Sequence, residues 1–334
     1  MRQTFNTLLR RLSQAGYKNE FVRAAILPDW WEEACAEEPN LLQDFEIRVA
    51  RFLSVPLATV SDPSIPLRAP AYPAAQLRRV RDINRDRLGP SIHTAMKVAE
   101  AAVRNLRNAS NAPRIPPLDG LQWREETRRP GKAITLDDIL ADLWKRGIPV
   151  VPLNVLPAPR FQGMSCIVQN RPVILIGHKN DEPSRLAFLI AHEAGHIAAG
   201  DCVPDQPVVD EEEEIVDGTN IERAADRYAT RALVGGDKVP HVDGAHFKDL
   251  AARAVEIERE TGADAGTIIS AWAARTGDYT KATLAWKALY RSSGARVKIL
   301  QYFNRHIDIE EAAETDRDLL RCVYSEAIPH ETSG

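Results

Sequence analysis

The sequence predicts an α+β protein in which a small sheet and its helices lie between two mainly helical regions. Two observations favour this class. Apolar residues recur at helical spacing in most of the chain, whereas runs rich in Val and Ile that indicate strands gather within residues 148–177. With 334 residues, 44% of them hydrophobic, the chain is long enough for two or three domains with ordinary cores.

The first region, residues 1–54, is expected to be a small helical unit. Helices are predicted over 4–15, 21–26 and 41–53, since apolar residues recur there every three or four positions. Residues 50–60 weakly resemble the last helices of phage-repressor helix-turn-helix domains. The turn and the polar recognition helix of such domains are not found upstream, so DNA binding by this unit is a hypothesis.

The second region, residues 55–117, is predicted to be a proline-rich linker followed by two basic helices, over 74–88 and 91–107. The span 67–114 holds ten Lys and Arg against three Asp and Glu, a balance of +7. Such a patch can contact a phosphate backbone or an acidic partner, but it can also be an ordinary solvated helix face. The candidate contacts are Arg78, Arg79, Arg81 and Arg85.

The third region, residues 118–240, combines helices and strands. A helix is predicted from Thr135, which can cap it, to Gly147. A strand over 148–153 contains two prolines, which favour a position at the edge of a sheet. Two further strands, 163–169 and 172–177, are expected to form a hairpin, and a helix follows from Ser184 to Gly200. The final region, residues 241–334, is predicted to be helical.

The stretch His192-Glu193-Ala194-Gly195-His196 has the form H-E-x-x-H and lies on the predicted helix 184–200. Positions i and i+4 share one face of a helix, so His192 and His196 can direct two imidazoles at one point, with Glu193 beside it. Neutral imidazoles are good ligands for Zn²⁺, and a neighbouring carboxylate can take a proton from a water on the metal. A core helix with two hydrogen-bonded histidines and a purely structural zinc site are the alternatives.

A catalytic zinc site needs a third protein ligand, and Glu222 can supply it. Asp226 lies one helical turn further on and can accept a hydrogen bond from the free ring nitrogen of a ligand histidine. Three alternatives remain: Glu222 as a helix-capping carboxylate, Cys202 as a loop ligand, and cation binding by the acidic run 210–214. His241 and His246 could stabilise an oxyanion, although their spacing selects neither.

The pattern H-E-x-x-H followed by E-x-x-x-D on a second helix resembles that of thermolysin-like zinc peptidases. Together with the strand 173–176, the helices 186–196 and 222–229 resemble the ImmA/IrrE family of bacterial and phage metallopeptidases. This resemblance covers roughly residues 130–235. At position 226 this chain has Asp where relatives more often have Asn.

This resemblance implies a zincin-like metallopeptidase domain, a small sheet with metal-binding helices. In it Zn²⁺ is held by His192, His196 and Glu222, and Glu193 is the catalytic base. It further implies an endopeptidase that cleaves a protein partner. Family members are implicated in cutting helix-turn-helix repressors in stress, mobile-element or defence switches, and others accompany toxin–antitoxin modules.

A regulatory protein with a non-catalytic zinc module, which binds DNA or a toxin, is the competing hypothesis. The net charge of −4 argues against a protein that coats nucleic acid along its whole surface. Four widely spaced cysteines without a C-x-x-C pair fit a reducing compartment, and no segment has the character of a secretion signal or approaches the roughly 20 apolar residues of a membrane span. We therefore expect a cytoplasmic protein without membrane contact.

Overall fold

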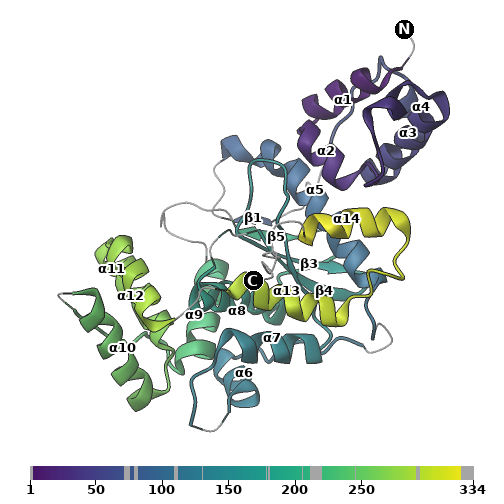
Figure 1. Cartoon of the computed structure of the whole chain (residues 1–334). Helices are drawn as coiled ribbons and strands as arrows, with labels where there is room; N and C mark the ends of the chain where they lie inside the picture. The colour runs from purple at the N-terminus through teal and green to yellow at the C-terminus, as the bar shows by residue number, and fades with distance from the viewer. Residues whose placement is uncertain are drawn as a thin grey trace, which may run out of the picture.

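In a computed structural model the chain has an α+β fold, mostly helical, around one small mixed sheet, as the sequence predicts (Figure 1). The structure describes residues 3–70, 76–78, 82–108, 112–129, 131–177, 179, 181–204, 206–210, 220–244, 246–290 and 294–324. No helix within these ranges combines the length and the apolar character needed to span a bilayer.

The sheet has five strands in the order β1-β5-β3-β4-β2. Their bounds are β1 Gln76–Arg78, β2 Val150–Pro152, β3 Gly163–Val168, β4 Arg171–Ile176 and β5 Val208–Asp210. The predicted hairpin is confirmed: β3 and β4 are antiparallel, and Gln169 and Asn170 in their turn have φ of 49° and 61°, as a type I′ turn requires. β2 lies at an edge, parallel to β4, as its prolines indicated. The sequence did not indicate β1 and β5.

The N-terminal unit contains α1 Phe5–Gln14, α2 Asn19–Ala25, the 3₁₀ helix η1 Glu33–Glu37, α3 Pro39–Leu53 and α4 Leu57–Ser61. Its core is rich in aromatic rings, which pack edge-on or tilted at 5.2–5.8 Å between centroids. Helix α4 lies inside the predicted linker and packs on α3. The buried Arg11 guanidinium donates to the carbonyls of Thr59, Val60 and Ile65 at 2.6–2.9 Å, so this part of the linker belongs to the unit.

The helices predicted over 74–88 and 91–107 are helical in most of their length, but the predicted break between them and the predicted start at residue 74 are wrong. Strand β1 comes first, and one helix, α5 Asp82–Arg104, then runs through Pro90. Proline inside a helix costs about 3 kcal/mol, but buried apolar residues on both sides of it, among them Leu88, Ile92 and Met96, offset this cost. Of the basic candidates, Arg79 and Arg81 lie outside the described residues, as do the side chains of Arg78 and Arg85.

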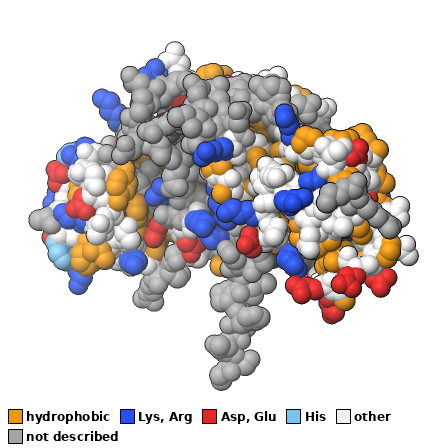
Figure 2. Space-filling model, turned by 90° about the horizontal axis from the view of Figure 1, so that it is seen from above, with side chains coloured by type: hydrophobic (Ala, Val, Ile, Leu, Met, Phe, Trp, Pro, Cys, Tyr) orange, Lys and Arg blue, Asp and Glu red, His pale blue; other side chains and the backbone are white. Residues whose placement is uncertain are grey.

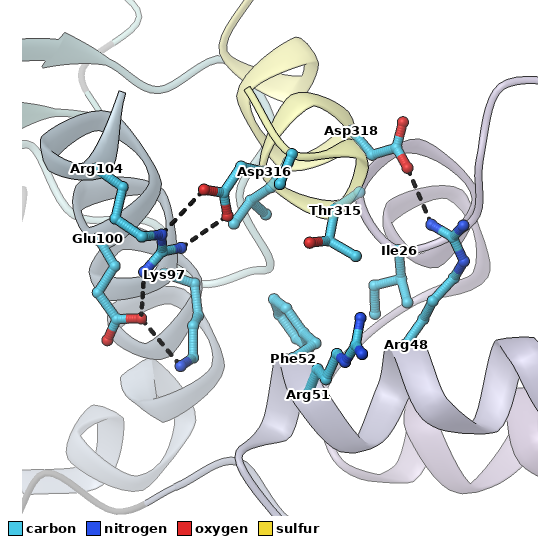
Figure 3. Close-up of a pocket in the computed structure, with 13 residues that line it drawn as sticks. Ile26, Arg48, Arg51, Phe52, Lys97, Glu100, Arg104, Thr315, Asp316 and Asp318 are labelled. Carbon is cyan, nitrogen blue, oxygen red and sulfur yellow. Dashed lines mark hydrogen bonds and ion pairs between the residues drawn. The ribbon is translucent and has the colours of Figure 1, made fainter. Parts of the chain in front are cut away.

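Helix α14, Glu314–Tyr324, joins the N-terminal unit to α5 (Figure 3). On one side the buried Arg48 of α3 donates to Glu314 at 2.6 Å and to Asp318 at 3.1 Å. On the other side Arg104 of α5 makes two bonds to Asp316, at 2.7 and 2.9 Å. A cavity of about 430 Å³ lies between the three elements. The contact thus combines ion pairs with the buried apolar residues Leu319 and Leu320 of α14.

The remaining helices are α6 Gly120–Thr127, α7 Leu136–Lys145, α8 Pro183–Ala199, α9 Asn220–Val234, α10 Phe247–Thr261, α11 Ala265–Thr276, α12 Tyr279–Leu289 and α13 Ala295–His306. The predicted cap of α7 is present as a full capping box between Thr135 and Asp138. Both α5 and α8 pack on β3 and β4, while α10, α11 and α12 form a group beside the sheet that reaches it through α8 (Figure 1). Helix α8 is therefore central to the fold.

Candidate metal centre

The motif helix α8 places His192 and His196 side by side in the protein interior. The helix begins with Pro183 in its first turn and ends at Gly200, whose φ of 77° closes it in the left-handed region. Because the two histidines are four residues apart, their rings lie on one face, and their Nε2 atoms are 3.1 Å apart. Both side chains are buried, so the predicted pair faces the interior and not solvent.

Helix α9 brings Glu222 to the same point. Its Oε2 lies 3.4 Å from His192 Nε2, and its Oε1 lies 3.6 Å from His196 Nε2. Ligands held tetrahedrally about 2.1 Å from a metal are themselves about 3.4 Å apart, so these separations fit one shared ion. A buried carboxylate beside two imidazoles is also costly unless a positive charge accompanies it. The three predicted ligands could therefore hold a metal ion, whose identity the geometry leaves open.

Small residues allow α9 to approach α8 this closely. Gly195, inside the motif, faces Tyr228, and a Cβ at position 195 would lie 3.1 Å from that side chain. Ala225 and Ala229 are buried on the same helix as Tyr228. The C-terminal carbonyls of α9 are fixed in turn by the buried Arg124 guanidinium, which donates to Ala232 at 2.9 Å and Leu233 at 2.8 Å. Glu222 thus sits on a helix that is fixed along its length.

Each histidine is oriented by a carboxylate on its other ring nitrogen. His192 Nδ1 donates to Asp226 at 2.9 Å, as predicted from the spacing of Glu222 and Asp226. His196 Nδ1 donates to Asp201 at 2.8 Å, and sequence reasoning missed this partner. Asp201 directly follows Gly200, where the chain leaves α8, so a carboxylate just beyond the end of the motif helix was the available signal. With Nδ1–H engaged, both Nε2 lone pairs are left for a metal.

The carboxylate of Glu193 is buried and lies against strand β3. Ser165 donates its hydroxyl to Glu193 Oε2 and lies 3.1 Å from the backbone carbonyl of the same residue. Gly163 leaves room for the other oxygen, because a Cβ there would overlap Oε1. Residues 163 and 165 lie on the same face of β3, as alternate positions in a strand do. Neither residue was among the predicted site residues.

The alternative ligands receive other roles. Cys202 is buried, burial raises the pKa of its thiol, and it is not part of the ligand group that converges within the described residues. Exposed His241 pairs with Asp243 at 2.9 Å, and His246 accepts from Lys248 N at the start of α10. Both histidines thus have local surface roles. Residues 211–219, which include most of the acidic run, lie outside the described residues.

Comparison with models of protein families, with curated proteins and with solved structures finds no match to this chain.

Proposed function

We propose that the protein is a zinc-dependent endopeptidase. The observation that carries this proposal is the convergence of His192, His196 and Glu222, buried and 3.1–3.6 Å apart, with the carboxylate of Glu193 on the same helix. Two imidazoles and one carboxylate are a common zinc set, and three protein ligands leave the fourth position open for water. A structural zinc site would more commonly close that position with a fourth protein ligand.

The protein groups divide the work as follows. When bound, Zn²⁺ would lower the pKa of water and polarise a peptide carbonyl. His192, His196 and Glu222 hold it, and the two carboxylates on the Nδ1 atoms keep the imidazoles in the tautomer that binds. Glu193 takes the proton from the attacking water and delivers it to the amine that leaves.

The proposed substrate is a protein, in particular a helix-turn-helix repressor, as the resemblance to ImmA/IrrE peptidases implies. The sharpest test incubates the pure protein with the product of a neighbouring repressor-like gene, with and without a chelator. Cleavage that a chelator stops and added Zn²⁺ restores supports the proposal. Metal analysis of the same sample is needed, because two His and one carboxylate also bind Fe(II) in oxygenases, and stoichiometric iron would reject the assignment.

Glu193→Gln is the matched variant for the chemistry. It keeps size and burial but removes the base, so we expect full metal content and cleavage reduced at least ~10²-fold. Single-turnover cleavage of the repressor, with bound metal measured in parallel, checks this. Cleavage near the wild-type rate by this variant would refute the role of Glu193.

A second candidate function is binding of DNA by an inert metal module, which the surface charge favours. Several Lys and Arg side chains lie over the middle of one face with a few Asp and Glu side chains among them, and a denser group of Asp and Glu side chains lies at the lower right (Figure 2). A band shift on the promoter of the operon that weakens with salt, without any cleavage of the repressor, would select this function over the peptidase.

A further inference from the structure

We propose that Ser165 is a positioning residue that holds the carboxylate of Glu193 in its working orientation. The proposal rests on the endopeptidase function above and extends it to strand β3. The strand and the motif helix are in direct contact, and the contact is made at the residue to which the proton transfer is assigned. Glu193 would then depend on the sheet as well as on α8.

The hydrogen bond has a defined direction. Ser165 is fully buried, and its hydroxyl carries one proton. Two acceptors on Glu193 lie near it, the backbone carbonyl at 3.1 Å and the carboxylate oxygen Oε2. The carbonyl lies in the interior of α8, where the helix ladder already supplies it with a donor. The proton therefore goes to the charged oxygen, where a hydrogen bond is strongest.

Strand β3 also sets the position of the second oxygen. Gly163, two residues before Ser165 on the same face, has no Cβ and so leaves space for Oε1. A glutamate has three rotatable bonds, and a carboxylate without these neighbours could rotate away from the attacking water. Misplacement of a reacting group by about 1 Å can cost about 10²-fold in rate. Ser165 thus acts on catalysis through Glu193.

The test compares Ser165→Ala with a matched control, Ser91→Ala. Ser91 is also fully buried, and its hydroxyl lies 2.6 and 2.5 Å from the backbone carbonyls of Pro157 and Pro159, which can accept its one proton. We expect Ser165→Ala to keep stoichiometric metal and an unchanged KM while kcat falls ~10- to 100-fold. Ser91→Ala should keep kcat, and Ser165→Thr should recover most of the loss because it restores the hydroxyl.

A double-mutant cycle of Ser165 and Glu193 distinguishes a positioning role of Ser165 from a general role in the stability of the fold. In the Glu193→Gln background, Ser165→Ala should cause little further loss, since the base it positions is already removed. An additive loss in the double variant, an unchanged kcat in the single variant, or a change confined to KM or metal content would overturn the proposal.

A crystallographic readout keeps the proposal testable if the wild type cleaves nothing, which would refute the endopeptidase function alone. In metal-loaded crystals of Ser165→Ala we expect the Glu193 carboxylate to leave its place on β3 or to occupy two orientations. The same carboxylate position in the variant and in the wild type would overturn the role of Ser165.

Discussion

Acidification between pH 6.5 and 4 should destabilise the protein through one buried histidine, His93 of α5. Its side chain is buried, and its Nε2–H donates to the Phe52 carbonyl at 2.6 Å. Its ring packs edge-on against that of Phe52, with centroids 5.2 Å apart. Burial, with a smaller contribution from the nearby Lys97 charge, lowers the pKa of His93 to about 4. The histidine is therefore neutral in the folded protein and ties α5 to the N-terminal unit.

The sign and size of the effect follow from the two pKa values. In the unfolded chain His93 takes up a proton below its ordinary pKa of about 6.5, whereas in the folded protein it does not until about pH 4. The free energy of unfolding that the neutral His93 contributes is fully present above pH 6.5, and it is lost as the pH falls from 6.5 to 4. The loss amounts to about 2 kcal/mol at pH 5 and approaches about 3.4 kcal/mol at pH 4 and below.

The assay is urea unfolding at a series of pH values for the wild type and for His93→Gln. Glutamine keeps an N–H donor for the Phe52 carbonyl but does not titrate. Carboxylates titrate in both proteins, so they cancel in the difference between the two stability curves. The wild type should lose about 2 kcal/mol more than the variant between pH 7 and pH 5. Parallel curves for the two proteins would show that burial of a neutral His93 does not govern this range.

Three further predictions concern the metal and the α14 contact. A chelator should lower the Tm, and saturation at 1,000 times the Kd should restore about 4 kcal/mol, measured by calorimetry; an unchanged Tm would mean that no ion is held. Asp201→Asn should weaken metal affinity about 10- to 100-fold in competition titrations, and an unaltered affinity would remove Asp201 from the site. Arg48→Met should cost about 3 kcal/mol in urea unfolding because Asp318 stays buried without this guanidinium, while Arg104→Met, whose arginine is more exposed, should cost about 1 kcal/mol. Equal losses of stability in Arg48→Met and Arg104→Met would contradict the view that burial of the ion pair sets its contribution.

The parts of the fold and the site that could be predicted from the sequence are those with a local signal. His192 and His196 repeat at the spacing of a helix, and Glu222 and Asp226 do so again, so each pair could be placed on one face before any contact was known. The hairpin likewise follows from two apolar runs around a short polar turn. The packing of the two helices against each other is a tertiary contact that the sequence does not show. In that contact residue 195 is a glycine because Tyr228 lies against it.

The missed features have no local signal of this kind. A serine in an apolar strand gives no indication that its hydroxyl will meet a glutamate 28 residues later. A break was predicted between helices 74–88 and 91–107, but the chain forms one continuous helix there, with buried residues on both sides of Pro90. Strands β1 and β5 are three residues each and depend on pairing with β5 and β3. Short strands are specified by their partners more than by their own residues.

The charges around the centre explain why these carboxylates belong together. Glu193, Glu222, Asp201 and Asp226 lie beside two histidines, and three of the four make a hydrogen bond to a histidine or a serine of the site. If the imidazoles are neutral, as metal ligation requires, no positive charge on the histidines balances these carboxylates. Solvent can screen the partly exposed Asp226, but it cannot reach the buried Glu193 and Glu222. A divalent cation would place positive charge at the point where Glu222 and both Nε2 atoms meet. The same buried charges that are costly without a cation therefore favour a doubly charged ion, and in the proposed mechanism Glu193 would act beside it as the base.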